Sequence, residues 1–342
     1  MRAPAYWWRP GSGALLSPLA VIYGAAAQLR LRRPGRSAGI PVICLGNLTV
    51  GGGGKTPAAL AVARLLLSAH RRPFFLSRGY GGRLAGPVLV NPSVFRAVDV
   101  GDEPLLLARL ASTIVARDRV AGAQAARLAG AGVIVMDDGF QNPSLKKDLA
   151  ILVVDGRRGI GNGRIIPAGP LRAPLAAQLA RAHALVIVGP GDGSDAVAEI
   201  ARRRGLALFH GRLEPDRETL AALMHPRILA FAGIADPEKF FATLADAGVE
   251  IAERRSFPDH HRYTPAEAKM LLASAERERL VLLTTEKDHV RLGGDPRLTA
   301  LAVRTGVLPV RMRIQEEEAF REMVLNAVSR AEPVGPNPVG QP

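Results

Sequence analysis

Thr49-Val50-Gly51-Gly52-Gly53-Gly54-Lys55-Thr56 is the stretch of this sequence that decides its fold. Its end matches the phosphate-loop pattern G-x-x-x-x-G-K-[ST], although Thr49 stands where that pattern begins with glycine. Glycines let the backbone wrap inward with its N–H groups facing anionic oxygens. We therefore expect all eight residues to bind a nucleotide, with Lys55 reaching the β- and γ-phosphates of ATP and Thr56 binding Mg²⁺. The alternative is a plain glycine turn that carries a surface lysine.

The segments on either side of this loop favour the phosphate-loop interpretation. Residues 40–45 are a short apolar run, which is typical of a buried strand. Residues 57–69 have the apolar spacing of a helix, and Pro57 suits a first helical turn because its missing N–H has no intrahelical partner there. A strand, a glycine-rich loop and a helix in this order open a phosphate-binding βα unit.

The rest of the chain predicts a parallel sheet. Short apolar runs that we expect to be strands alternate with helical segments. The strands are expected at residues 74–76, 114–116, 133–136, 150–154 and 184–188, and the helices at 104–111 and 119–129. This alternation favours an α/β fold of the P-loop NTPase type, in which helices cover both faces of the sheet and ligands bind beyond the carboxyl ends of its strands.

We expect four segments in the chain. An N-terminal apolar segment spans residues 1–36, and the P-loop core domain spans residues 37–215. A smaller α/β domain over residues 220–330, with strands at 228–231 and 281–283, closes over the nucleotide. Residues 331–342 are rich in proline and glycine, which is typical of a disordered tail.

The charge of the chain is unevenly placed. Its 342 residues include 45 Lys and Arg against 31 Asp and Glu, and 13 of the basic residues precede the first acidic one, Asp99. This argues against a nucleic-acid-binding coat and predicts a local anionic partner, such as a nucleotide or an anionic membrane surface. The single cysteine, Cys44, excludes an internal disulfide and a cysteine-based zinc cluster. No obligate protein partner is evident.

The N-terminal segment has no charged residue between Arg9 and Arg30. Aromatic residues and an arginine cluster accompany it: Trp7, Trp8, Tyr23, Arg30, Arg32, Arg33 and Arg36. We expect an interfacial anchor whose arginines meet anionic lipid. Prolines and glycines leave only residue 19 onward cleanly apolar, which is too short to span a bilayer. The alternatives are a helix docked on the core and a signal peptide, although the nucleotide motif argues against secretion.

Acidic residues next to expected strands and helices are candidate catalytic groups. Asp137 and Asp138 follow the apolar run 133–136, where the Mg²⁺-binding carboxylate of a phosphate-loop enzyme belongs. The alternative for this pair is a solvated strand end. Asp102 precedes a helix, so it either caps that helix or serves as a general base for an acceptor hydroxyl.

Several loop residues have two interpretations each. Asp259-His260-His261 forms an acid–base or metal site or is merely solvated, and residues 284–288 (TTEKD) form a capping turn or a cleft wall. Four further residues are candidates for binding phosphate or substrate, with ordinary loop chemistry as the alternative: Asn47, Arg78, Arg164 and Arg172.

Seven ordered motifs resemble those of the tetraacyldisaccharide 4′-kinase, or lipid A 4′-kinase, family. The motifs are NLTVGGGGKTP, SRGYGG, VGDEP, DDGFQ, GNGRIIPAGPLR, FPDHHRY and TTEKD. The resemblance implies transfer of the γ-phosphate of ATP to the 4′-hydroxyl of a tetraacyl glucosamine disaccharide 1-phosphate in lipid A biosynthesis. It also implies a peripheral or monotopic protein at the cytoplasmic face of the inner membrane, held there by its N-terminal segment.

The resemblance also assigns roles to particular residues. It implies that Lys55 and Thr56 hold phosphate and Mg²⁺, that Asp137 and Asp138 are the paired acidic motif, and that Asp102 is a base paired with His260 across two domains. One departure is Asn142, where many members carry histidine. Two other classes remain as alternatives: a P-loop ATPase or GTPase acting as a switch or metal chaperone, and a membrane-associated nucleotide-binding scaffold.

Overall fold

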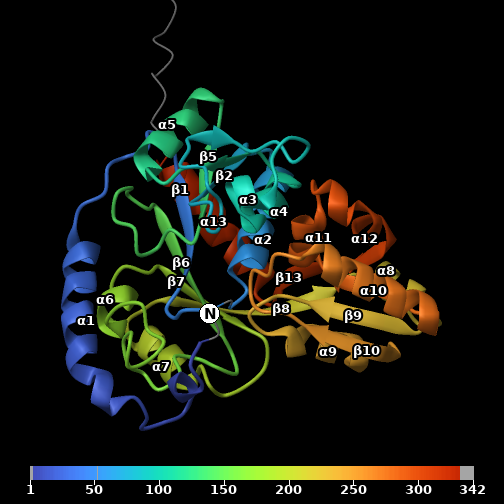
Figure 1. Cartoon of the computed structure of the whole chain (residues 1–342). Coiled ribbons are helices and arrows are strands. Elements are labelled where there is room, and N and C mark those ends of the chain that lie inside the picture. Colours follow the sequence, from blue (N-terminus) through green and yellow to red (C-terminus); the bar gives the residue numbers. More distant parts are fainter. Residues whose placement is uncertain (1–2, 52, 332–342) are drawn as a thin grey trace, which may run out of the picture.

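The computed structural model describes residues 3–51 and 53–331. Two α/β units lie side by side, and the N-terminal helix runs along the outer side of the larger one (Figure 1). The larger unit comprises η1 (Ala5–Trp8), η2 (Ala14–Leu16), α1 (Ser17–Arg32), β1 (Val42–Asn47), α2 (Lys55–Ser68), β2 (Pro73–Ser77), β3 (Val88–Leu89), α3 (Ala97–Val100), α4 (Asp102–Ala108), β4 (Thr113–Val115), α5 (Arg119–Leu128), β5 (Val133–Asp137), β6 (Leu149–Asp155), α6 (Leu175–Leu179), β7 (Ala184–Val188), α7 (Asp195–Arg203), β8 (Ala207–Pro215), β13 (Val310–Ile314) and α13 (Glu317–Ala331).

The larger unit is built on a nine-stranded sheet with the order β13-β8-β7-β6-β1-β5-β2-β4-β3. Its seven inner strands are parallel, while β13 and β3 pair antiparallel at the two edges. Side chains of β1 alternate between two apolar cores: Ile43 and Leu45 join α2, α4 and α13, whereas Val42 and Cys44 join α5, α6 and α7. The expected α/β fold with helices on both faces is confirmed.

Strand β1 positions the phosphate loop. It lies between β5 and β6, and the chain continues to β2 and β4 on one side of it and to β7 and β8 on the other. Such a switch point opens a crevice at the carboxyl ends of the strands, which is where α/β proteins bind ligands. Helix α2 begins at Lys55, earlier than expected, so that Lys55 and Thr56 belong to its first turn.

The smaller unit has its own parallel sheet, with the order β10-β9-β11-β12. Its elements are α8 (Arg217–Ala222), β9 (Ile228–Ala232), α9 (Pro237–Asp246), β10 (Ile251–Ser256), α10 (Pro265–Glu278), β11 (Val281–Thr285), α11 (Glu286–Leu292), η3 (Pro296–Leu298), α12 (Thr299–Arg304) and β12 (Thr305–Leu308). One apolar cluster lies under α10 and α12, and another lies under α9. The unit therefore has helices on both faces of its sheet.

The expected smaller domain over residues 220–330 was wrong in its extent. Strand β13 pairs with β8 of the larger sheet, from Val310 opposite Pro215 to Ile314 opposite Gly211. Helix α13 then packs its buried Val324 into the core beside α2. The chain thus returns to the larger unit after β12, because this apolar strand and helix complete its core. In the expected tail 331–342, residue 331 is the last of α13, and the others lie outside the described residues.

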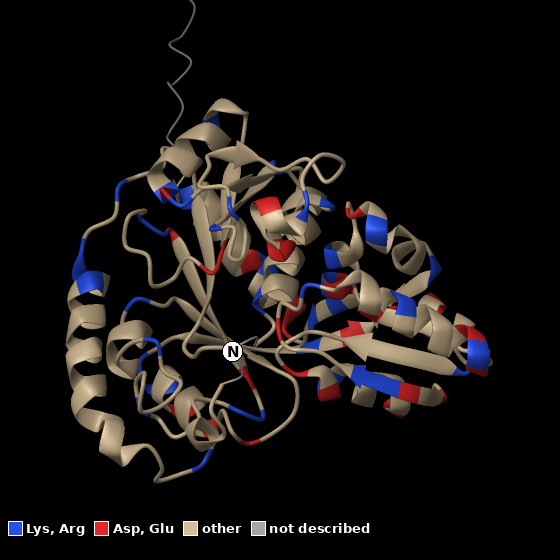
Figure 2. Cartoon of the chain, in the orientation of Figure 1, with Lys and Arg blue, Asp and Glu red and all other residues tan. Residues whose placement is uncertain are grey.

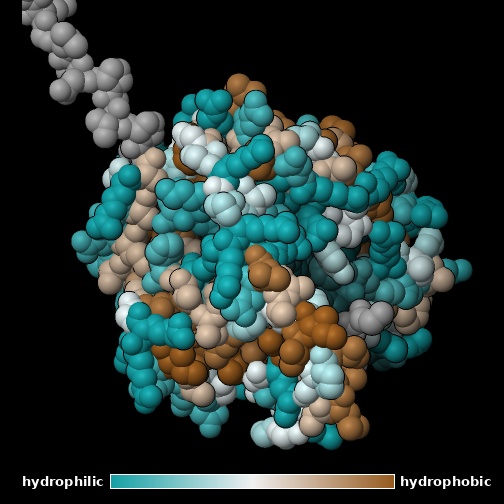
Figure 3. All heavy atoms as spheres, turned by 90° about the vertical axis from the view of Figure 1, so that its left-hand side faces the viewer, coloured by the Kyte–Doolittle hydropathy of each residue, from teal (hydrophilic) through white to brown (hydrophobic). Residues whose placement is uncertain are grey.

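The N-terminal helix corrects two sequence-based interpretations. Residues Ala14–Arg32 form a helix of 19 residues with a mean hydropathy of 1.4, which is enough by length and composition alone to cross a membrane. The segment is therefore not too short, because the helix begins directly after Gly13. Only 17% of its apolar window is buried, which argues against a core helix. Apolar side chains gather on this face of the molecule (Figure 3), and the helix carries basic residues only at its C-terminal end (Figure 2).

Candidate active site

The loop after β1 has the backbone of a phosphate cradle. Gly51 and Gly54 have φ angles of 110° and 87°, which side-chain-bearing residues rarely adopt. The side-chain amide of Asn47 donates a hydrogen bond to the carbonyl oxygen of Gly51 at 3.2 Å, and a Cβ on Gly53 would lie 3.0 Å from that amide nitrogen. Asn47, expected to bind substrate, thus braces the loop. Gly52 lies outside the described residues.

Arg172 ties the loop to the second residue of the acidic pair. Its Nε donates to the carbonyl oxygen of Thr49 at 3.1 Å, and its Nη1 lies 2.7 Å from Oδ1 of Asp138. The other oxygen, Oδ2, lies 2.7 Å from Nζ of Lys55. Burial raises the pKa of Asp138, but the charges of Lys55 and Arg172 outweigh it and hold that pKa well below its usual value. Asp138 is therefore an anion with two cationic partners.

Asp137 has the environment of a metal ligand. The hydroxyl of Thr56 donates to its Oδ2 at 3.3 Å, while its Oδ1 is buried without a hydrogen-bond partner. Burial, reinforced by the charge of Glu103, raises the pKa of Asp137 to about 7. A bare carboxylate oxygen beside a threonine hydroxyl fits Mg²⁺. The described residues contain no cluster of three or more His, Cys, Asp or Glu, so phosphate oxygens and water would supply the remaining Mg²⁺ ligands.

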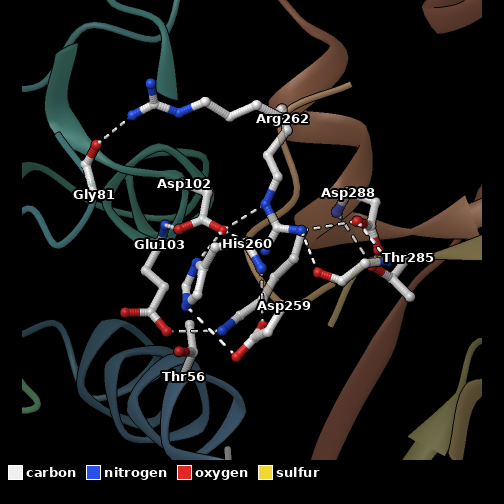
Figure 4. A network of polar contacts seen from close by, with 12 residues as sticks. Thr56, Gly81, Asp102, Glu103, Asp259, His260, Arg262, Thr285 and Asp288 are labelled. Atoms are coloured by element: carbon white, nitrogen blue, oxygen red, sulfur yellow. Dashed lines mark hydrogen bonds and ion pairs between the residues drawn. The ribbon is translucent and has the colours of Figure 1, made fainter. Parts of the chain in front are cut away.

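An Asp–His pair joins the two units. Asp102 is the first residue of α4, and its Oδ2 accepts a hydrogen bond from Nδ1 of His260, which follows β10, at 3.0 Å (Figure 4). The sequence-based pairing of these residues is therefore realised as a contact. The capping alternative is partly realised as well: Gly101 is the N-cap residue, but Oδ1 of Asp102 accepts a hydrogen bond from the backbone N–H of Glu103, in the first turn of α4, at 2.9 Å.

Both members of this pair have shifted pKa values. Burial raises the pKa of Asp102, but the hydrogen bond from His260 and the charges of Arg291 and Lys287 hold it well below its usual value. The hydrogen bond to Asp102 raises the pKa of His260. The pair is thus a fixed carboxylate next to an imidazole of enhanced basicity.

Sequence reasoning missed the arginine that holds Asp102. Arg291 lies on α11, and its Nη2 and Nε are 2.5 and 2.7 Å from Oδ2 of Asp102. Its Nη1 donates to the carbonyl oxygen of Gly233 and to Asp288, and Asp288 also accepts from the Tyr263 hydroxyl at 2.9 Å. The motif TTEKD provided a signal for this region, since it contains Asp288 and ends three residues before Arg291.

Comparison with known proteins agrees with this geometry. A family model described as tetraacyldisaccharide-1-P 4′-kinase matches residues 12–329. A tetraacyldisaccharide 4′-kinase of Rhodopseudomonas palustris strain BisB18 is 51% identical over 333 residues, which are 97% of each chain. The chain belongs to the tetraacyldisaccharide 4′-kinase family. A relative with the same name from Bradyrhizobium sp. strain ORS 278 is 50% identical over 97% of this chain and 99% of its own.

A solved structure supports the same membership. The structure of LpxK from Aquifex aeolicus in complex with ATP superposes with a TM-score of 0.72 and 28% identity, covering 92% of this chain and 99% of that chain. The sequence-based family, enzyme class and cofactors are thereby confirmed: the protein is a kinase that uses ATP with Mg²⁺.

Not every candidate of the sequence analysis lies in the active site of this kinase. Arg164 donates to the Ser17 hydroxyl at 2.7 Å, so it anchors α1 rather than facing the phosphate loop. The side chain of Asn142 accepts from Ser144 within its own turn. His261 pairs with Glu267 at 3.0 Å, which leaves His260 as the partner of Asp102. Arg78 is exposed directly after β2, at the same end of the sheet as the phosphate loop, and its role in binding substrate stays a prediction.

Two residues of the kinase site share an unusual backbone conformation. Asp138 and His260 each have a φ of 55°. Among the described residues other than glycine, only His70 and Arg279 also have a positive φ. A left-handed conformation is unfavourable for most side chains and persists where the surrounding contacts enforce it, often at functional sites. The hydrogen bonds and ion pairs of Asp138 and His260 provide such contacts.

Proposed function

We propose that this kinase transfers the γ-phosphate of ATP to the 4′-hydroxyl of a tetraacyl glucosamine disaccharide 1-phosphate, a step of lipid A biosynthesis. The observation that carries the proposal is the Asp102–His260 pair, which joins the two units on the side where Thr56 of the phosphate-loop helix lies (Figure 4). A hydroxyl acceptor needs a proton acceptor beside the phosphate site, whereas a nucleotide switch has no such need. The names of its relatives support this acceptor.

The pair acts as a general base in which His260 accepts the proton and Asp102 orients His260. Arg291 keeps Asp102 ionised, so Asp102 fixes the tautomer of His260 and stabilises its charged form. Nε2 of His260 faces the side on which Thr56 and Glu103 lie (Figure 4). This refines the sequence-based assignment of Asp102 as the base, because the proton passes to Nε2 of His260.

The bond changes of the transfer balance as follows. The acceptor oxygen loses its proton to Nε2 of His260 and forms a bond to the γ-phosphorus. The bond from that phosphorus to the bridging oxygen breaks, and ADP leaves with the electron pair. Thr56 and Asp137 would hold Mg²⁺, which would neutralise charge on the phosphates when bound. Lys55 leaves Asp138 to contact the phosphates.

A cavity beside the phosphate loop supports a lipid-linked acceptor. It has a volume of about 410 Å³ and lies between α1 and the loop. Tyr23, Arg30 and Leu31 of α1 line one side, and Val50 and Arg172 line the other. A polar headgroup bound there would leave its acyl chains next to the apolar face of α1.

We propose the cytoplasmic face of the inner membrane as the location of this enzyme, bound as a peripheral or monotopic protein. ATP is available on that side, and η2 and α1 expose large apolar side chains before the basic end of α1: Leu15 (96% exposed), Leu19, Val21, Ile22 and Leu29. The arginines in the last turn of α1 bind an anionic membrane surface, which is a second partner besides the lipid acceptor.

The test is phosphate transfer from radiolabelled ATP to purified tetraacyl disaccharide 1-phosphate in mixed micelles. We expect label in the lipid, no transfer after Mg²⁺ is chelated, and little ATP hydrolysis without lipid. Equal hydrolysis with and without lipid would reject the proposed acceptor and favour the nucleotide-switch class. Flotation with anionic vesicles, comparing the full chain with one lacking residues 1–36, tests the location.

A further inference from the structure

Lys287 is a half-buried cation that the transfer described above does not use. It is the second residue of α11 in the smaller unit, and its Nζ lies 2.7 Å from Oε1 of Glu103, the second residue of α4 in the larger unit. The side chains of Lys287 and Glu103 are 27% and 19% exposed. The ion pair therefore crosses from one unit to the other and is largely withdrawn from solvent.

The charge of Lys287 belongs to the cluster around the phosphate loop. It interacts electrostatically with Asp137, and so does the charge of Lys55. Both lysines also interact with Glu103. In Figure 4 the carboxylate of Glu103 lies on the same side as Thr56. Two ammonium groups thus approach one acidic centre from opposite units, the first from the phosphate loop and the second from α11.

The two lysines have matching ion pairs. Lys55 lies 2.7 Å from Asp138, and Lys287 lies 2.7 Å from Glu103. A lysine that is largely withdrawn from solvent is stabilised by a negative partner, because an unpaired charge in a desolvated site is costly. ATP brings several negative charges into this crevice, and each lysine can then exchange its carboxylate for a phosphate oxygen.

The geometry of phosphoryl transfer requires a donor opposite the loop. The phosphate loop belongs to the larger unit, whereas Lys287 belongs to the smaller unit, so a phosphate bound between them would have a cation on each side. Charge on the γ-phosphate oxygens must be neutralised during transfer, and many phosphate-loop enzymes use a cation from outside the loop for this purpose. Lys287 is placed for this function by the start of α11.

We propose that Lys287 is a second phosphate-binding lysine of this kinase, whose ammonium leaves Glu103 and contacts the γ-phosphate of ATP. It neutralises the phosphoryl group while the bond from phosphorus to the bridging oxygen breaks and ADP takes the electron pair. The inference deepens the proposed function by naming the group on the smaller unit that binds the transferred phosphate. It rests on the proposed transfer only for the catalytic step, since ATP binding needs no lipid.

The test compares the affinities of MgATP and MgADP by isothermal titration calorimetry without lipid. We expect Lys287→Met to weaken MgATP binding about tenfold, as for the loss of one charge-assisted hydrogen bond, and to leave MgADP binding within about twofold. Lys287→Arg should retain part of the preference for MgATP. Unchanged MgATP binding, or an equal loss for both nucleotides, would overturn the proposal.

Two further variants separate phosphate contact from a structural role. The double variant Lys287→Met/Glu103→Gln removes both charges, so no buried carboxylate is left unpaired. It should keep the selective loss of MgATP affinity, and full recovery would show that Lys287 only neutralises Glu103. Arg262→Met is the matched control, because this exposed cation also crosses between the units by donating to the Gly81 carbonyl at 3.1 Å. Its nucleotide preference should equal that of the unmodified protein.

The lipid-transfer assay distinguishes this inference from the proposed function. Failure to phosphorylate the lipid, together with a selective MgATP loss in Lys287→Met, would reject the acceptor and retain the role of Lys287. Lipid transfer at an undiminished rate in Lys287→Met would reject the role of Lys287 and retain the acceptor.

Discussion

The ammonium nitrogen of Lys55 lies 2.7 Å from Oδ2 of Asp138, while Arg172 holds the other oxygen of the same carboxylate. The lysine expected to bind phosphate is thus fixed in place before nucleotide arrives. When Lys55 turns to the phosphates, Asp138 keeps Arg172 as a cationic partner, so the exchange does not leave this half-buried anion unpaired.

Lys55→Met should lower kcat/KM for ATP by about 10²–10³. The variant removes a positive charge that stabilises the transition state of phosphate transfer more than it stabilises bound ATP. Steady-state kinetics of labelled phosphate transfer measures this. Lys146→Met is the control. Lys146 is exposed, and its Nζ pairs with Oδ1 of Asp148 at a distance of 3.8 Å rather than with a residue of the phosphate loop. A Lys55→Met enzyme within threefold of the control would contradict the assigned role.

The pH dependence of kcat/KM should report on His260. Its pKa is raised by the hydrogen bond to Asp102, and only the neutral imidazole accepts a proton. Activity should therefore fall as pH drops through a value above about 6.5, the ordinary pKa of histidine. Asp102→Asn removes the carboxylate, so the acid limb should move to lower pH and the rate should fall by about 10²–10⁴. An acid limb at the same pH in both proteins would refute this role of the pair.

The same pair should make stability depend on pH. A raised pKa in the folded state means that protonated His260 stabilises the fold below its unfolded pKa of about 6.5. This contribution is lost as pH rises through the folded pKa. The loss of unfolding free energy caused by His260→Gln should thus be larger at pH 5.5 than at pH 9, as urea denaturation at both values can measure. A loss that grows with pH would have the wrong sign.

Charge on the outer face of α1 should weaken membrane binding without unfolding the protein. Val21 and Ile22 are each 69% exposed, so Val21→Glu/Ile22→Glu disturbs little internal packing. We expect vesicle flotation to fall about tenfold or more, because burying a charge in a lipid interface is unfavourable. The thermal midpoint of the soluble protein should stay within about 2 °C. Val303→Glu, at another exposed apolar position, is the control for added negative charge and should float like the unmodified protein.

Two neighbouring leucines of α2 should differ strongly in their effect on stability. Leu66 is fully buried against the central sheet, whereas Leu67 is 40% exposed. Leu66→Ala should lower the unfolding free energy by about 2–5 kcal/mol through lost burial and a cavity. Leu67→Ala should cost less than about 1 kcal/mol. Denaturant unfolding followed by circular dichroism compares the two, and similar costs would contradict the packing of α2.

The sequence predicted most of the larger unit because its signals are local. The apolar run before Thr49 and the glycines after it fix a strand and a loop without reference to distant residues. Strand β13 was not recognised, because residues 310–314 alternate apolar and basic side chains and acquire their burial only through pairing with β8. The start of the helix at Ala14 was not predicted either, because it depends on the left-handed backbone conformation of Gly13 at the end of the preceding loop.

The site residues that lie within one contiguous motif could be predicted from the sequence. Those whose contacts join distant segments could not be predicted from local patterns. Lys55 and Thr56 follow from a contiguous pattern. Arg291 and Lys287 gain their roles only when α11 is packed against α4, a contact between residues separated by nearly 190 positions. Similarly, the assignment of Asp137 to Thr56 and Asp138 to Lys55 depends on the left-handed turn at Asp138, which composition does not reveal.

The pairing of Val310 with Pro215 has an architectural consequence. Strands β8 and β13 are adjacent and antiparallel, and Asp216 donates its backbone N–H to Pro309 just beyond the pair. The smaller unit therefore occupies the position of the short turn that would join β8 and β13 in a hairpin. It is an insertion, and the chain enters it after Asp216 and leaves it before Pro309. The phosphate loop lies in the larger unit, whereas His260, Lys287 and Arg291 lie in the inserted smaller unit. Replacing that unit by a tight turn would remove these three groups in one step and leave every strand pair of the nine-stranded sheet in place.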